Sequence, residues 1–344
     1  MNLKIIGIDL AKQVFQVCAL SECNKVRFNK ALPRAQLLDF LRQHEPTIVA
    51  MEACASAHFW AREIAQLGHE IRLVPAQHTK AFARVGKTDA KDALAICEAA
   101  LRPNIHFVPP KTVAQQDLML LHSTREAFIQ QRTATMNRLR SVAGEYGFAL
   151  PKSQTKCLCA LTAALEDADN DLSFVARHVL HQAVEQWRNL SVQLADIEKQ
   201  LKQVSKQNDA YTKLQTVPGI GPIIASTFIA SVGNGAAFAK GRHVSAWAGL
   251  VPRQQGSGGK TQLHGITKNG NRYLRKQLVH GARIVVSWAI RKPVDNPMGR
   301  WLRHLVNTRG KNKAVVAYAN KMARVAWALV HYDQTFDMNK AFAH

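Results

Sequence analysis

The chain has 344 residues, of which 47% are apolar, so its composition is that of a folded protein with two or three domains. Lysine and arginine total 46 against 24 acids, and the formal charge of +22 predicts a polyanionic partner, with nucleic acid favoured over an anionic membrane surface. The sequence pattern shows no membrane span, no signal peptide and no CxxC zinc site. We therefore expect reduced cysteines and a cytoplasmic, nucleoid-associated protein.

Residues 1–108 are predicted to form an α/β domain of the RNase H-like type. Short apolar runs predict an antiparallel meander of three strands over residues 5–9, 15–20 and 25–29. A helix over 33–43, a strand over 47–51, a helix to residue 67 capped by Ser56, a strand over 69–74 and a helix over 89–100 capped by Thr88 follow in order. Three strands followed by alternating helices and strands describe an RNase H-like fold.

Residues 109–205 lack strand signals and carry long amphipathic helical patterns. The first pattern breaks near residues 144–151, and the second runs from Leu172 to Val204. Amphipathic helices of this length usually pair, so we predict a coiled-coil arm that acts as a spacer or in oligomerisation. A plain helical bundle fits the same pattern.

Residues 206–344 are predicted to form a mostly helical basic domain. Between Thr216 and Tyr332 there are 18 lysines or arginines and one acid, Asp295. The glycine-rich turn from Thr216 to Pro222 leads into an apolar helix, which is the pattern of a helix-hairpin-helix element that binds phosphate. Tight helix pairs use similar turns, so this pattern also fits simple packing.

Four acids occupy places where they can converge on one metal pocket. Asp9 and Glu52 end apolar strands, and Asp89 and Asp92 share one face of a helix. Carboxylate oxygens suit Mg²⁺ or Mn²⁺, and two such ions about 4 Å apart can position a phosphodiester for transfer. The competing interpretations are that Asp9 caps a turn and that the helical pair complements the helix dipole.

Ser257 is the candidate nucleophile, because glycines on both sides leave its hydroxyl unobstructed in what reads as a flexible loop. Ser245 lies twelve residues earlier and is the alternative nucleophile. The competing interpretation is that Ser257 is a linker serine with no catalytic role. No general base is evident; His243, His264 and metal activation remain open.

The basic side chains near these motifs are candidate contacts to nucleic-acid phosphates. Arg253 and Lys260 flank the serine, where they can stabilise an anionic phosphate in the transition state. The full set of predicted nucleic-acid-binding residues is Lys12, Lys87, Lys91, Arg253, Lys260, Lys268, Arg272, Arg275 and Lys276.

Together these motifs resemble one family over nearly the whole chain. The segments that carry the likeness are Gly7-Ile-Asp9-Leu-Ala-Lys12, Glu52, Lys87-Thr-Asp89-Ala-Lys-Asp92-Ala and the block from Val217 to Arg275. In this combination the chain resembles the DEDD transposases of the 110/1111 family of bacterial insertion sequences.

The resemblance implies a RuvC-like N-terminal domain, a coiled-coil arm and a C-terminal transposase domain. It implies that Asp9, Glu52, Asp89 and Asp92 bind metal and that Ser257 joins covalently to DNA. It further implies a structured bridge RNA that pairs with donor and target DNA, and a tetramer built as a dimer of dimers. Acids and serine then come from the same or from different subunits.

The expected function is therefore RNA-guided DNA recombination through a phosphoserine intermediate. One rival is a junction-resolving nuclease that uses the acids alone and water, for which Ser257 is dispensable. The other rival is a non-catalytic nucleic-acid-binding scaffold in which the acids are structural.

Overall fold

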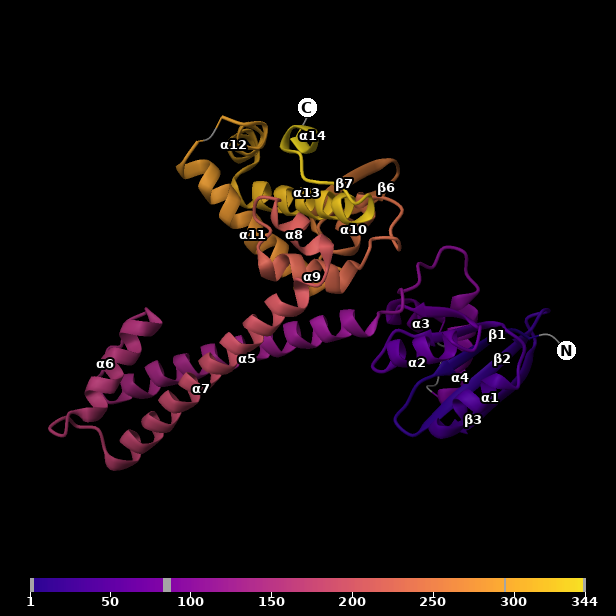
Figure 1. Cartoon of the computed structure of the whole chain (residues 1–344), viewed down its shortest axis with the longest axis horizontal. Coiled ribbons are helices and arrows are strands. Elements are labelled where there is room, and N and C mark those ends of the chain that lie inside the picture. Colours follow the sequence, from indigo (N-terminus) through magenta and orange to yellow (C-terminus); the bar gives the residue numbers. More distant parts are fainter. Residues whose placement is uncertain (1–2, 83–87, 294, 343–344) are drawn as a thin grey trace. The chain divides into compact units, whose positions relative to one another are not determined.

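The computed structural model describes residues 3–82, 88–293 and 295–342. The chain forms two compact units, residues Met1–Val113 and Ala114–His344 (Figure 1). Among the described helices, none combines the length and the apolarity needed to cross a bilayer.

The first unit is built on a mixed five-stranded sheet with the strand order β3-β2-β1-β4-β5. The first three strands pair antiparallel, and β4 and β5 continue the sheet parallel to β1. Their bounds are β1 (Leu3–Asp9), β2 (Val14–Ser21), β3 (Val26–Pro33), β4 (Ile48–Glu52) and β5 (Glu70–Val74). This order confirms the predicted sequence of strands and is consistent with an RNase H-like domain.

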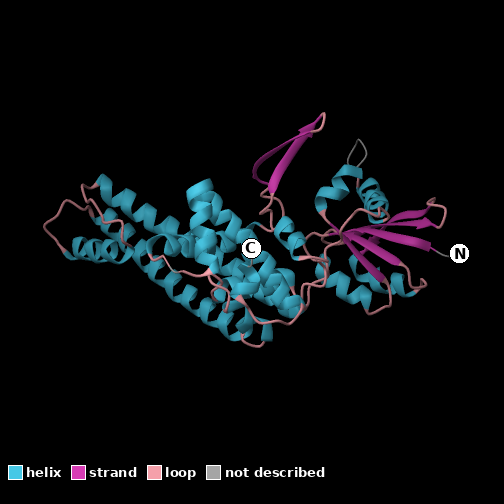
Figure 2. Ribbon diagram, turned by 90° about the horizontal axis from the view of Figure 1, so that it is seen from above, coloured by secondary structure: helices cyan, strands magenta, loops and turns pink. Residues whose placement is uncertain are grey.

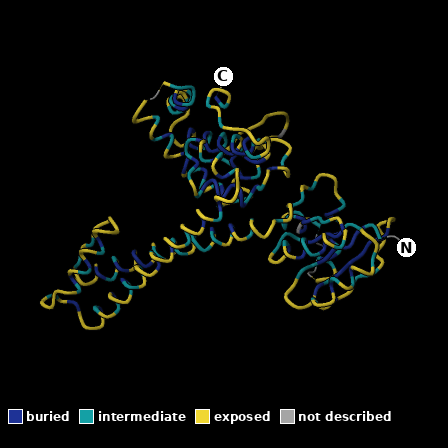
Figure 3. The backbone as a smooth tube through the Cα atoms, in the orientation of Figure 1, coloured by how far each residue is buried: buried dark blue, intermediate teal, exposed yellow. Residues whose placement is uncertain are grey.

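Helices cover both faces of this sheet, so the central strands are buried and read as continuous apolar runs (Figure 3). On one face lie α1 (Leu37–Arg42), preceded by a 3₁₀ turn, and α2 (Ala57–Ala65). On the other lie α3 (Ala76–Phe82), which the sequence pattern did not predict, and α4 (Asp89–Ala100). Ser56 precedes α2 as predicted, but it has φ of 67° and its side chain caps nothing, so the expected capping is wrong.

Gly7 in β1 lets α4 pack directly against the sheet. A Cβ atom at this position would lie 2.5 Å from the Cys97 sulfur and 2.7 Å from the Ala93 carbonyl oxygen. Real Cβ atoms do not approach other atoms so closely, so only glycine permits this packing. The close approach sets the distance between α4 and β1.

The second unit contains an antiparallel pair of long helices, α5 (Val113–Glu145) and α7 (Phe174–Ser205). Arg125 forms an ion pair with Glu198, and further along the pair the Arg132 guanidinium lies over the Trp187 ring. At the far end α6 (Gln154–Glu166), which was not predicted, packs with both helices around Leu161. The helical pairing is as predicted, while coiled-coil geometry stays a prediction. We call α5–α7 the arm.

The rest of the second unit is a helical domain whose core also takes in the base of the arm. Apolar side chains of α9, α11 and α13 form most of this core, and Leu118 and Leu201 of the arm join it. The helices are α8 (Asp209–Gln215), α9 (Pro222–Val232), α10 (Gly241–Trp247), α11 (Arg272–Arg291), α12 (Pro297–Arg309), α13 (Lys311–His331) and α14 (Met338–Phe342).

The expected flexible loop around the serine is instead a β-hairpin, so that expectation is wrong. Strands β6 (Pro252–Ser257) and β7 (Lys260–Ile266) pair antiparallel, and Gly258 and Gly259 form the two-residue turn with φ of 57° and 79°. Positive φ at both turn residues is the geometry that two-residue hairpins prefer. Figure 2 shows the hairpin as a separate two-stranded ribbon.

The predicted helix-hairpin-helix turn connects α8 to α9 and is packed against the domain core. Gly219 has φ of 88°, and its carbonyl lies so close to Gly281 of α11 that a Cβ there would sit 2.1 Å from it. The Tyr318 hydroxyl donates to the Pro218 carbonyl at 2.8 Å. Packing therefore accounts for the glycines, and phosphate binding by this turn stays a prediction.

Candidate functional site

Two of the predicted acids lie at adjacent strand ends on the same face of the sheet. Ile8 of β1 is the register partner of Met51 of β4, and Asp9 and Glu52 follow them directly. Because side chains alternate along a strand, Asp9 and Glu52 project to the face that α4 covers, as Gly7 and Ala50 do. Both acids are half-buried.

The first turn of α4 brings two more acids to this edge. The Thr88 hydroxyl caps the helix by accepting a hydrogen bond from the Lys91 amide, as predicted. Asp89 and Asp92 then lie in the first turn, Asp89 exposed and Asp92 half-buried. Carboxylate oxygens of Asp9, Asp89 and Asp92 all lie within 4.8 Å of one another. We call these three residues the acid cluster.

The spacing of the acid cluster fits a divalent cation. Oxygens that share one Mg²⁺ lie about 2.1 Å from the ion, so they are at most about 4.2 Å apart, and the longer bonds of Ca²⁺ allow more. Three like charges held this close repel one another unless a cation lies among them. The oxygen-only donor set suits hard cations but does not select one of them.

Glu52 lies next to the acid cluster but outside its 4.8 Å grouping. Its Oε2 atom accepts a hydrogen bond from the Thr79 hydroxyl of α3 at 2.8 Å. Burial first, and then the charges of Glu52 and Asp9, raise the pKa of the Cys54 thiol, so all three groups share one neighbourhood. Thr79 is a buried residue that sequence reasoning missed. Metal binding by Glu52 stays a prediction.

A second set of polar residues that the sequence did not single out holds the start of α4. The Gln16 amide donates to the Asn29 side chain at 2.6 Å, and the Asn29 amide donates to the Ala90 carbonyl at 2.7 Å. These bonds tie β2 and β3 to the turn that carries Asp89. The available signal was a polar glutamine inside the apolar run of residues 14–21.

The second unit carries the predicted serine. Ser257 is the last residue of β6 and its backbone pairs with Lys260, but its side chain lies outside the described part of the structure. Ser245 is 1% exposed, and its hydroxyl donates to the Arg242 carbonyl at 3.0 Å inside α10. A buried serine that is bonded to its own helix is a poor nucleophile for a large substrate.

The predicted nucleic-acid contacts fall into groups. Side chains of Lys12, Arg253, Lys260, Lys268 and Arg272 are exposed, Lys91 is half-buried, and Lys87 lies outside the described residues. The functional assignments of all of them stay predictions.

Two basic residues of α11 have protein partners. Lys276 lies 2.5 Å from Glu126 of the arm, which lowers the pKa of that carboxyl. Arg275 donates to the Ala248 and Asn269 carbonyls at 2.8 and 2.7 Å, at the base of the hairpin. Arg275 therefore holds the hairpin in place.

A buried polar network joins the arm to this domain. His122 of α5 is 3% exposed, and its ring lies 3.0 Å from the Ser226 hydroxyl and 3.3 Å from the Tyr273 hydroxyl. Burial, and then the charge of Arg125, lowers the pKa of His122 to about 4. The imidazole is therefore neutral at physiological pH.

Comparison with known proteins identifies the class of protein to which this chain belongs. A transposase profile of the IS110 DEDD type matches residues 6–147, and a profile described as the transposase IS116/IS110/IS902 family matches residues 211–295. The "Probable family 20 transposase" of Pseudomonas aeruginosa is 41% identical over 96% of this chain and 97% of its own length. The transposase for insertion sequence element IS1111A of Coxiella burnetii is 37% identical over 97% and 92%. The transposase for insertion sequence element IS1328 of Yersinia enterocolitica is 35% identical over 97% and 99%.

These matches define an enzyme that acts on DNA, a transposase. The chain belongs to the IS116/IS110/IS902 family of transposases. A DEDD-type family indicates dependence on a divalent metal, and among the residues that the structure describes the acid cluster is a group of carboxylates that could hold such an ion.

Proposed function

We propose that this transposase cuts and exchanges DNA strands by metal-dependent phosphoryl transfer to Ser257, guided by a structured bridge RNA. The observation that carries the proposal is the acid cluster, because it places three carboxylates at one edge of an RNase H-like sheet in a transposase. In this proposal Asp9, Asp89 and Asp92 hold Mg²⁺ or Mn²⁺, and Glu52 completes the set. The bound ion would polarise the scissile phosphate and neutralise charge in the transition state.

The proposed chemistry conserves the phosphodiester bond. The Ser257 oxygen forms a bond to phosphorus and loses its proton to a base, while the bond from phosphorus to one deoxyribose oxygen breaks and that oxygen takes up a proton. The products are a phosphoserine and a free DNA hydroxyl. Attack by the hydroxyl of another strand on the phosphoserine reverses these changes and joins the exchanged strands. Ser257 is preferred over Ser245, because Ser245 is buried and bonded within α10.

The guide RNA and the tetramer belong to the same proposal. An RNA guide leaves sequence recognition to base pairing, so the protein needs mainly positive charge for backbones, which the formal charge of +22 supplies. Phe174 and Val175 at the start of α7 are 84% and 69% exposed, and such apolar side chains on the arm favour self-association.

The test is a reconstituted recombination reaction. The full chain is incubated with donor and target DNA, the RNA transcribed from the flanking DNA and Mg²⁺, and products are separated on a denaturing gel. Wild-type protein should give recombinant DNA and a protein–DNA adduct. Ser257→Ala should give neither, while the matched variant Ser245→Ala should keep the chemistry in whatever fraction folds.

The rival functions give different results. Cleavage by Ser257→Ala without any adduct would identify a hydrolytic nuclease of the junction-resolving type. Full recombination by Asp9→Asn and Asp92→Asn would remove the metal site from the mechanism, and a chain that binds but never cuts would be a scaffold. Omission of the RNA tests guidance separately, and mass photometry with DNA tests the tetramer.

A further inference from the structure

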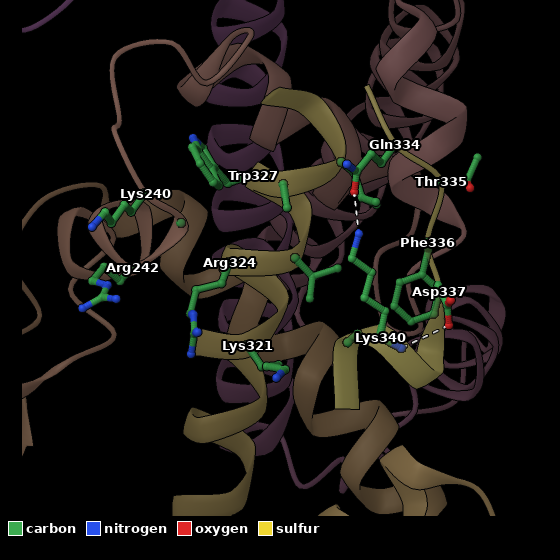
Figure 4. Close-up of a pocket in the computed structure, with 15 residues that line it drawn as sticks. Lys240, Arg242, Lys321, Arg324, Trp327, Gln334, Thr335, Phe336, Asp337 and Lys340 are labelled. Atoms are coloured by element: carbon green, nitrogen blue, oxygen red, sulfur yellow. Dashed lines mark hydrogen bonds between the residues drawn. The ribbon is translucent and has the colours of Figure 1, made fainter. Parts of the chain in front are cut away.

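A cationic pocket of about 350 Å³ lies in the second unit, between α10, α13 and the C-terminal segment (Figure 4). Five lysines or arginines and one acid line it. The cations are Lys240, Arg242, Lys321, Arg324 and Lys340, and the acid is Asp337. Figure 4 shows these side chains on the start of α10, on α13 and on the C-terminal segment that follows α13. The acid cluster is in the other unit, so this pocket is a separate feature.

Within the described part of the chain, the one carboxylate of the pocket lining is engaged elsewhere. The Asp337 carboxylate caps α14 by accepting from the Asn339 and Lys340 amides at 2.8 and 3.2 Å. Gly241 packs so closely on α13 that a Cβ there would lie 3.0 Å from the Arg324 carbonyl oxygen. This contact fixes the start of α10 beside the pocket wall.

Lys321 shows the electrostatic consequence most clearly. It is half-buried, its ammonium group lies 5.3 Å from the centre of the Phe342 ring, and among the described residues no carboxylate lies within ion-pair distance of it. Burial, and then the charge of Arg324, lowers the pKa of Lys321. A desolvated cation beside a second cation is unfavourable, and a bound anion would relieve both effects.

The remaining lining is mostly apolar, and Gln334 and Thr335 are its polar members. Val325, Ala328 and Leu329 of α13 and Phe336 and Ala341 of the C-terminal segment contribute to it. Cations beside apolar side chains in one pocket can bind an anionic group that is attached to a flat apolar one. The volume is at the lower end of small-molecule sites, so it fits one nucleotide and excludes a duplex.

We propose that this pocket binds one unpaired nucleotide of a nucleic-acid strand, with its phosphate on Arg242, Arg324 and Lys321 and its base on the apolar side chains of the lining. The proposal rests on the proposed function, since it gives the nucleic-acid partner a defined anchoring site. The same chemistry is offered by an RNA strand and by a DNA strand that is unpaired during exchange.

The experiment compares two charge-matched double variants of the full chain. Arg242→Gln with Arg324→Gln removes two pocket cations, and Arg309→Gln with Lys313→Gln removes two exposed cations of the same domain that do not line the pocket. Binding of fluorescein-labelled 12-nucleotide single strands, one RNA and one DNA, is measured by fluorescence anisotropy over a range of salt concentrations. Circular dichroism melting checks that both variants fold.

The pocket variant should bind at least one of the strands about tenfold more weakly than the control variant. Its salt slope should fall by up to about 0.7, since the pocket holds one phosphate and each phosphate contact on a single strand contributes about 0.7. The probe that shows the loss identifies the strand. An oligomer with the same phosphates but abasic sites should show a much smaller difference between variants. Equal binding by the two variants, or an equal loss with the abasic oligomer, would overturn the proposal.

These outcomes are separable from the proposed function. Asp9→Asn should bind the strands as wild type does and fail to cut DNA. If Asp9→Asn cuts normally, the proposed function fails while the pocket result stands. If only the pocket result is negative, recombination by the wild-type chain is unaffected.

Discussion

The contact between Gly7 and α4 predicts that Gly7→Ala displaces α4 and so disturbs the geometry of the acid cluster. The new methyl group would meet the Cys97 sulfur at 2.5 Å and the Ala93 carbonyl oxygen at 2.7 Å, whereas ordinary contact begins at 3.4 Å. The carbonyl is backbone, so a rotamer change cannot relieve the overlap and α4 must retreat by about 1 Å. Overpacking of this kind costs about 1–3 kcal/mol, which corresponds to a decrease in melting temperature of roughly 4–13 °C for a unit of this size.

The functional loss should exceed the loss of stability. Because Asp89 and Asp92 lie in the first turn of α4, a displaced helix separates them from Asp9. A displacement of about 1 Å in a reactive group can lower the rate by about 100-fold. DNA cutting by the folded fraction measures this effect, and hydrogen–deuterium exchange of the β1 and α4 peptides reports local unfolding within the full chain.

Gly144→Ala is the matched control, since a Cβ at Gly144 meets nothing within 4 Å. Gly144 lies inside α5, so alanine there should be neutral or stabilising by up to about 1 kcal/mol. Cys97→Ala combined with Gly7→Ala should recover only part of the loss, because the Ala93 carbonyl remains. If Gly7→Ala melts and cuts like wild type, the described packing of α4 on β1 is refuted.

Three further predictions concern polar contacts. Thr79→Val removes the hydroxyl that donates to Glu52 and should lower the free energy of unfolding in urea by about 1.5–3 kcal/mol and slow DNA cutting, while Thr79→Ser restores both. The pKa of His122 is about 4 in the folded protein and 6.5 in an unfolded chain, so the unfolded chain takes up the proton first as the pH falls. The free energy of unfolding should therefore decrease between pH 6.5 and pH 4, by up to about 3 kcal/mol. In urea unfolding, His122→Gln should make the free energy of unfolding depend less on pH in this range, and an unchanged pH dependence would contradict the prediction. Arg275→Gln should loosen the hairpin base and lower the melting temperature, whereas Arg272→Gln should weaken nucleic-acid binding and reduce its salt slope without changing the melting temperature.

The fold of the first unit could be predicted because its signals are local. Apolar runs that end at residues 9, 51 and 74 mark strands, and Thr88 marks the start of α4 through its hydroxyl. Convergence of Asp9 with Asp92 followed from the same reasoning, since strand ends and a helix start meet at one edge of an α/β sheet. The roles of Thr79 and Asn29 were not predictable, because each depends on a partner distant in sequence.

The hairpin and the cationic pocket were missed for different physical reasons. Residues 252–266 are glycine-rich, polar and almost entirely exposed, so no apolar alternation indicates β6 and β7. The backbone torsions of Gly258 and Gly259 and the anchoring by Arg275 define them instead. Arg242 and Arg324 are 82 positions apart in sequence, and only tertiary packing brings both to the lining of one pocket.

In this transposase, most of the excess positive charge lies in a different unit from the carboxylates of the acid cluster. A metal site within a chain of charge +22 is at risk, because lysine or arginine side chains that reach the carboxylates would displace the ion. Asp9 and Asp92 lie half-buried at a sheet edge, and most of the excess cations lie beyond residue 216 in the other unit. Phosphates of a polynucleotide are ligands both for a divalent cation and for basic side chains, so under the proposed function one substrate can engage each of these regions.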